Sequence, residues 1–211
     1  MTPPTLILAS GSPRRRELLA SLGLDFTVLK PDVDETQHPG EAPDAYVYRL
    51  SREKAAAIAE RLHADGQHDA TILAADTIVV LAADTAGDLD GEVLGKPADP
   101  DEARLMLQRL RARPHIVCTA ITVQAFHRDA AQARAITELT RTVVHMRDYT
   151  DAEIEAYIAS GDPFDKAGGY AIQHEGFRPA ARIEGSHTNV VGLPLETLRR
   201  MLTELGVPVQ S

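Results

Sequence analysis

The stretch Thr71-Ile-Leu-Ala-Ala-Asp-Thr-Ile-Val-Val-Leu-Ala-Ala83 is the most hydrophobic segment of the chain. Its run of aliphatic and β-branched residues predicts a buried strand. Asp76 interrupts that run. A buried carboxylate is unfavourable unless it is paired, binds a metal or stands at a strand end facing a cleft. The stretch therefore predicts a central strand and marks Asp76 as either a satisfied structural residue or a site residue.

The segments on either side of this strand alternate between helical and extended patterns. Before it we expect strands at 5–10 and 25–30 and helices at 13–21 and 44–63. After it we expect strands at 92–94, 116–126, 135–146, 169–173 and 179–183, and helices at 100–112, 151–160 and 194–205. Turns are expected at 84–91 and 127–132, and an irregular loop at 161–169. Early alternation followed by hairpins predicts an α/β fold with a mixed sheet.

Composition limits the class of protein. The 211 residues suit one large domain, or one domain with two lobes, since a domain takes roughly 100–200 residues. With 22 Lys and Arg against 31 Asp and Glu, the formal charge is −9, which disfavours a nucleic-acid coat or an anionic membrane surface. The single cysteine, Cys118, excludes an internal disulfide framework.

The chain carries no pattern for a membrane or for export. No apolar run reaches the roughly 18 residues of a membrane span, and the first ten residues lack a basic segment followed by a long apolar one. We therefore expect no membrane association and a cytoplasmic location.

Two arginines stand at an unusual place in the first predicted helix. Arg15 falls on the inward face and Arg14 flanks it, directly after the loop that contains Ser10. Cations at a helix N-terminus oppose the helix dipole, and a bound phosphate would satisfy both the guanidinium groups and the free N–H groups. Pairing with a local acid such as Glu17 is the alternative.

Lys54 is the second anomaly. At 100° per residue it lies about 20° from Val47, in the middle of the apolar stripe of the long helix. A lysine in that position extends its ammonium to solvent, pairs with a carboxylate or faces a polar cavity.

Further charged residues lie in loops. Lys96 follows a short strand, and the segment 161–173 combines glycines, acids and Lys166. Glycine-rich loops let the backbone approach a ligand, although a plain surface turn has the same composition. Several cations together with Glu35, Asp76 and other acids fit a polyphosphate site with a bound divalent metal.

Taken in order, these segments resemble the Maf family of nucleoside triphosphate pyrophosphatases. The matching pieces run over nearly the whole chain: 8–15, 33–35, the helix of Lys54, 75–78, 95–97, 165–168 with Gln173, and 191–194. The resemblance implies one Maf-type domain over residues 1–211, with an elongated, inosine-triphosphatase-like mixed sheet, flanking helices and two lobes around a cleft. It implies hydrolysis of a nucleoside triphosphate to monophosphate and pyrophosphate with Mg²⁺ or Mn²⁺, as nucleotide-pool housecleaning. It also suggests a homodimer.

The resemblance implies roles for particular residues. Asp76 matches the proposed general base, and Arg14, Thr77 and Gln173 match positions associated with base selection. That combination is similar to the dTTP/UTP branch, whereas the branch acting on 7-methyl-GTP carries Trp and Gln at the first two positions. The remaining site residues are assigned by chemistry: Lys54 and Lys96 for catalysis, Ser10, Arg15 and Lys166 for the substrate, and Glu35 with Asp76 for the metal.

Two questions stay open at this level. The sequence does not decide which acid is the base and which is only a metal ligand. A non-hydrolysing nucleotide-binding regulator of cell division or septum formation would use the same cations without a competent base. The longer turn at 83–91 departs from the family pattern.

Overall fold

The apolar stretch around Asp76 is strand β3, Ala70–Leu81, in a computed structural model that describes residues 5–81, 91–126 and 134–209. The sheet runs in the order β2-β1-β3-β5-β6-β7, with β4 paired to β3. β1 is parallel to β2 and β3, whereas β4 is antiparallel to β3 and β7 to β6. This confirms the predicted mixed α/β architecture. Of the predicted turns, 127–132 lies outside the described residues, as does nearly all of 84–91.

The strands and helices follow the predicted order closely. The strands are β1 (Thr5–Ala9), β2 (Phe26–Val28), β4 (Glu92–Leu94), β5 (Pro114–Phe126), β6 (Arg134–Met146) and β7 (Ala180–Glu184). The helices are α1 (Pro13–Ala20), α2 (Pro43–Ala64), α3 (Pro100–Leu110), α4 (Asp151–Ala159), α5 (His187–Val191) and α6 (Leu195–Glu204). The sequence did not predict α5, a helix of five residues that begins beside Ser186, whose Oγ accepts from the Asn189 N–H.

The chain divides into two compact units. Unit 1 comprises Met1–Asp76, Thr119–Thr140 and Gly192–Ser211, and unit 2 comprises Thr77–Cys118 and Arg141–Val191. The chain passes from one unit to the other within β3, β5 and β6, and once more directly after α5. Whether the chain is one functional domain stays a prediction.

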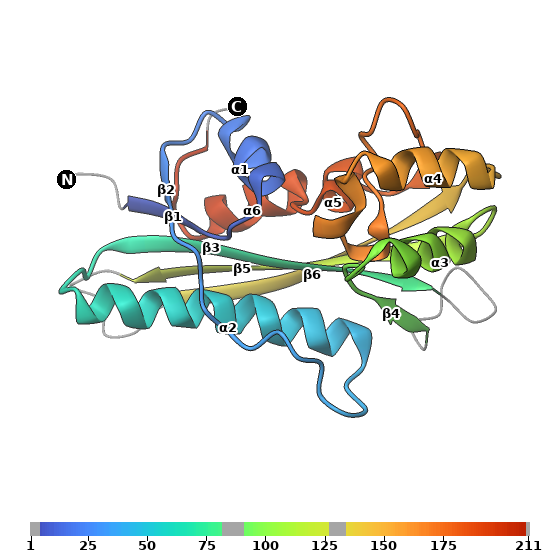
Figure 1. The fold of residues 1–211 in the computed structure, drawn as a ribbon. Helices are drawn as coiled ribbons and strands as arrows, with labels where there is room; N and C mark the ends of the chain where they lie inside the picture. The colour runs from blue at the N-terminus through green and yellow to red at the C-terminus, as the bar shows by residue number, and fades with distance from the viewer. Residues whose placement is uncertain (1–4, 82–90, 127–133, 210–211) are drawn as a thin grey trace. The chain divides into compact units, whose positions relative to one another are not determined.

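In unit 1, helices cover both faces of the parallel strands (Figure 1). Ile7 of β1 and its register partner Ile72 of β3 face α2, where they pack with Ile58. The neighbouring pair Leu8 and Leu73 faces the other way, toward α1 and α6. Because side chains alternate along a strand, two apolar faces require near-continuous apolar runs, as β1 and β3 have.

In unit 2, α3 and α4 pack over one apolar core. Leu107 of α3 and Ile154 of α4 share this core with Val117 of β5 and Val144 of β6. Thr150 begins α4 with a capping box, in which its side chain accepts from the Glu153 N–H and the Glu153 carboxylate accepts from the Thr150 N–H. Reciprocal caps of this kind fix where a helix starts.

The predicted strand at 169–173 is wrong. The chain forms two short 3-10 helices, η1 (Asp162–Asp165) and η2 (Ala167–Gly169), and then a turn. Gly168 and Gly169 have φ of 71° and 68°, in the left-handed region that a strand does not use. Consecutive glycines allowed this local path to replace the extended one.

Candidate active site

Three of the predicted site residues meet in unit 1. The Lys54 ammonium donates to Asp76 Oδ1 at 2.6 Å and lies 2.8 Å from Glu35 Oε1. Lys54 comes from α2, Asp76 from β3, and Glu35 from the irregular segment before α2. We call Glu35, Lys54 and Asp76 the acid–lysine cluster.

Pairing with Asp76 explains how Lys54 can occupy an apolar stripe. Its exposed fraction is 6%, and that of Asp76 is 8%, so neither charge is well hydrated. A buried ammonium needs a carboxylate partner, and each of these two residues supplies what the other lacks. Of the alternatives for Lys54, the structure contains carboxylate pairing rather than extension to solvent.

The two acids of the cluster differ in environment. Burial raises the pKa of Asp76 above the ordinary carboxyl value, although Lys54 and Arg15 attract its negative charge and oppose that rise. The Glu35 side chain is 51% exposed. A carboxylate with a raised pKa accepts a proton more readily near neutral pH, so the environment of Asp76 suits a general base.

The segment that carries Glu35 is fastened to α2. The Tyr46 hydroxyl donates to the Glu35 carbonyl oxygen at 2.6 Å. Arg49, one turn further along α2, donates to the Thr36 carbonyl at 3.1 Å and to both carboxylate oxygens of Glu41. These contacts hold a segment without regular secondary structure where its Glu35 side chain reaches Lys54.

Arg15 is held by backbone oxygens of unit 1. Its Nε donates to the Gly192 carbonyl at 2.9 Å and its Nη1 to the Ala75 carbonyl at 2.7 Å. Ser10, which is 5% exposed, lies with its Oγ 3.4 Å from the same Nη1. Burial lowers the pKa of Arg15, but an arginine keeps its charge in proteins. Arg15 therefore anchors the residue before Asp76 and adds positive charge beside it; Arg14 is half-buried next to it.

The other predicted residues belong to unit 2. Thr77 is half-buried in β3, and Lys96 is exposed in the loop after β4. That loop is joined to η2 by a hydrogen bond from the Gly168 N–H to the Gly95 carbonyl at 2.9 Å. The joint brings the backbone next to Lys96 against the segment that follows Lys166.

Lys166 is engaged by its own loop. Its ammonium donates to the Asp162 carbonyl at 2.6 Å, to Asp162 Oδ1 at 3.0 Å and to Asp165 Oδ1 at 2.5 Å. Three acceptors match the three donors of an ammonium group. Gln173, in contrast, is exposed in the turn that follows η2.

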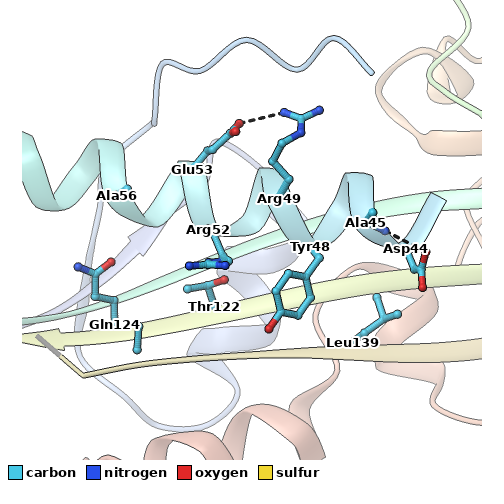
Figure 2. A pocket seen from close by; sticks show the side chains of 11 residues that line it. Asp44, Ala45, Tyr48, Arg49, Arg52, Glu53, Ala56, Thr122, Gln124 and Leu139 are labelled. Atoms are coloured by element: carbon cyan, nitrogen blue, oxygen red, sulfur yellow. Dashed lines mark hydrogen bonds and ion pairs between the residues drawn. The ribbon is translucent and has the colours of Figure 1, made fainter. Parts of the chain in front are cut away.

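Unit 1 also contains a cavity of about 690 Å³, which no residue of the acid–lysine cluster lines. Figure 2 shows Tyr48 and Arg52 extending from α2 toward β5, the strand that carries Thr122 and Gln124. None of the predicted site residues lines this cavity. The lining of this cavity therefore does not support a role for the cavity in nucleotide hydrolysis.

The sequence matches the family described as Maf-like protein over residues 5–205. The chain belongs to the Maf family. Curated Maf-like relatives include the dTTP/UTP pyrophosphatase of Myxococcus xanthus, 47% identical over 97% of this chain and 94% of that protein. Another is the dTTP/UTP pyrophosphatase of Syntrophus aciditrophicus, 44% identical over 95% of this chain and 90% of that protein.

Among solved structures, the Staphylococcus aureus Ham1 protein aligns with 95% of this Maf chain and 99% of its own at 13% identity, with a TM-score of 0.48. At that TM-score the likeness is too distant to bear on function. In the described part of the chain, no helix has both the length and the apolarity that crossing a bilayer requires.

The donor set of this Maf chain fits a divalent cation held together with substrate. Within residues 5–81, 91–126 and 134–209, no three His, Cys, Asp or Glu side chains gather into a metal-binding group. Glu35 and Asp76 nevertheless converge on one ammonium, so their carboxylates lie close together. Mg²⁺ needs only one or two protein carboxylates when waters and phosphates complete its shell.

Sequence reasoning missed Tyr157 and Asp162. The Tyr157 hydroxyl donates to Asp162 Oδ2 at 2.9 Å and accepts from the Ala171 N–H at 2.8 Å. Tyr157 has the periodicity of an ordinary core residue on α4, which hides any further role. Asp162 lies in the loop that drew attention for its composition, but nothing in the sequence links it to Tyr157.

Proposed function

We propose that this Maf-family chain hydrolyses dTTP and UTP to the monophosphate and pyrophosphate, as nucleotide-pool housecleaning. The relatives named as dTTP/UTP pyrophosphatases match it over nearly its full length. The observation that carries the chemistry is the buried pairing of Asp76 with Lys54, because it combines a proton acceptor with a cation in one place.

Asp76 accepts the proton of the water that attacks the α-phosphorus. Its raised pKa makes it a better proton acceptor than an exposed carboxylate, and its position on a rigid strand fixes the direction of attack. Lys54 holds Asp76 in place, and its positive charge stabilises the negative charge that builds up on the phosphate oxygens. A regulator that only binds nucleotide has no use for a buried proton acceptor.

Glu35 and Asp76 would hold a divalent cation, Mg²⁺ or Mn²⁺, which neutralises phosphate charge when it is bound. Arg15 adds a fixed cation beside Asp76 and Ser10 a hydroxyl beside Arg15. Lys96 and Lys166 are assigned to the substrate as well. Lys166 can take this part only by exchanging one of its present acceptors for a phosphate oxygen.

Arg14, Thr77 and Gln173 are assigned to selection of the base. The Gln173 amide has one donor and one acceptor group, which match the O4 and N3–H edge of uracil or thymine. Cytosine reverses this pattern with its N4 amine, so CTP should be a weaker substrate.

The reaction class is tested by hydrolysing UTP with Mg²⁺ in ¹⁸O-labelled water. Attack at the α-phosphorus puts the label in UMP and releases unlabelled pyrophosphate. Formation of UDP and labelled orthophosphate would refute the proposal.

A further inference from the structure

The Tyr157 hydroxyl connects two parts of the segment that holds Lys166 and Gln173. Tyr157 is 2% exposed in α4. Its O–H donates to Asp162 Oδ2, and its oxygen accepts from the Ala171 N–H. A phenol has one hydrogen to donate, and burial together with Asp162 raises the pKa of Tyr157, so that hydrogen stays in place at neutral pH.

On one side, this bridge continues to Lys166. Asp162 uses Oδ2 for Tyr157 and Oδ1 for the Lys166 ammonium, while its carbonyl oxygen takes a second hydrogen of the same ammonium. The carboxylate of Asp162 is therefore fixed from both ends. Loss of the tyrosine hydroxyl would free the Asp162 carboxylate to rotate, and this would loosen one of the three acceptors that hold the Lys166 ammonium.

On the other side, the bridge continues to Gln173. The residues 171–174 form a turn closed by a hydrogen bond from the His174 N–H to the Ala171 carbonyl at 3.2 Å. Tyr157 contacts both ends of this turn. Its hydroxyl accepts from the Ala171 N–H, and its ring meets the His174 ring edge-on, with 4.8 Å between the ring centroids. Gln173 lies inside the turn, with its side chain exposed.

We propose that Tyr157 is a positioning residue that sets the Lys166 ammonium and the Gln173 turn together, and so couples substrate affinity to base selection. This inference rests on the proposed function, in which Lys166 and Gln173 contact the nucleotide. Tyr157 itself does not touch the substrate; it acts through Asp162 and Ala171.

Tyr149 provides a matched control. It is equally buried, at 1% exposed, and belongs to the same apolar core. Its ring also packs against Phe177, as that of Tyr157 does. Its hydroxyl, however, donates to the Leu107 carbonyl in α3, away from the Lys166 and Gln173 segment. A phenylalanine at either position removes one buried hydroxyl and keeps the ring.

The experiment compares Tyr157→Phe with Tyr149→Phe in the full chain, using kcat and KM for UTP and CTP with Mg²⁺ and the thermal midpoint of each variant. We expect similar thermal midpoints for the two variants. Only Tyr157→Phe should raise the KM for UTP, by about five- to tenfold for one lost buried hydrogen bond, and lower the ratio of UTP to CTP efficiency. The kcat should stay within about twofold, because Asp76 and Lys54 are untouched.

A second pair of variants tests whether the effect of Tyr157→Phe passes through Asp162. Asp162→Asn weakens the same bridge from its other end and should also raise the KM. The double variant Tyr157→Phe/Asp162→Asn should be no worse than the more affected single variant, because both break one network.

If the wild type hydrolyses UTP, an unchanged KM and an unchanged ratio of UTP to CTP efficiency in Tyr157→Phe would overturn the positioning role of Tyr157. Equal kinetic changes in Tyr149→Phe would overturn it too, since they would reflect the core in general. A wild-type chain that releases no pyrophosphate would overturn the proposed function, and this inference with it.

Discussion

The acid–lysine cluster and the Tyr157 bridge both hold a lysine, but by different means. In the cluster, Lys54 and Asp76 are 22 residues apart in the sequence and come from a helix and a strand that the fold brings together. The two hydrogen-bond partners of the Tyr157 hydroxyl, and the His174 ring that meets the Tyr157 ring, lie within one stretch of the chain, 157–174. In the cluster, burial raises the pKa of Asp76 against the opposing effect of Lys54, whereas the bridge pairs a buried hydroxyl and a lysine with partners nearby in the sequence. The first arrangement suits chemistry, and the second suits fixing the shape of a loop.

The largest effect should follow from Asp76→Asn, which keeps the shape of the side chain but removes its charge and basicity. Loss of a general base typically lowers the rate by about 10²–10⁴-fold, and loss of a metal ligand adds to this. Lys54 keeps Glu35 as a partner, so the fold should survive. Steady-state kcat with UTP measures the loss of turnover, and the far-UV circular dichroism spectrum shows whether the fold is kept. Near-wild-type turnover in a folded sample would remove Asp76 from the chemistry.

Lys54→Met is the matched comparison for that variant, because it leaves the carboxylate and removes its nearest cation. Lys54 lowers the pKa of Asp76, so its loss should raise that pKa further. A general base works in its deprotonated form, and activity therefore falls as pH falls through its pKa. The acid side of the kcat/KM profile should move to higher pH in Lys54→Met. A profile that stays in place would mean that Asp76 does not control it.

A smaller effect should distinguish two glycines of unit 2, and it tests the claim that loop geometry there depends on backbone fit. Gly161 and Gly168 both have left-handed φ, of 77° and 71°. A Cβ at Gly161 meets open space, whereas at Gly168 it would lie 3.0 Å from Val79 Cγ2. Gly161→Ala should lower the free energy of unfolding by about 1–2 kcal/mol for the backbone strain alone.

Gly168→Ala should lower it by a further ~1–3 kcal/mol for the overpacking against Val79. Urea unfolding of both variants gives the difference. Equal losses would show that β3 yields to the added methyl group and that the fit at Gly168 is not restrictive.

The sequence was most informative where periodicity and burial conflict. The apolar patterns predicted β3 and α2, and within them Lys54 and Asp76 stood out separately as charges in apolar positions. A buried charge requires a partner, and here each is the partner of the other. Glu35 was assigned to the metal together with Asp76, but its ion pair with Lys54 was not predicted, because it lies in a segment without periodicity that contacts with Tyr46 and Arg49 hold in place.

Unit 2 shows where sequence patterns carried less information. The segment 169–173 has strand-like composition, but two consecutive glycines in the left-handed region take it along another path. Lys166 was predicted as a substrate contact, and its engagement by Asp162 and Asp165 has no sequence signature. The role of Tyr157 depends on where one hydroxyl points, which a helical period does not encode.

The most direct test of the proposed function is kcat/KM for dTTP, UTP, CTP, GTP and 7-methyl-GTP at one Mg²⁺ concentration, with monophosphate and pyrophosphate followed together. In the proposed function, Asp76 with Lys54 is assigned to hydrolysis, and Gln173, exposed on its turn, is assigned to the choice of base. We expect dTTP and UTP to be the best substrates, with CTP about tenfold weaker because one or two hydrogen bonds reverse. A clear preference for either purine nucleotide would contradict the assignment of the base.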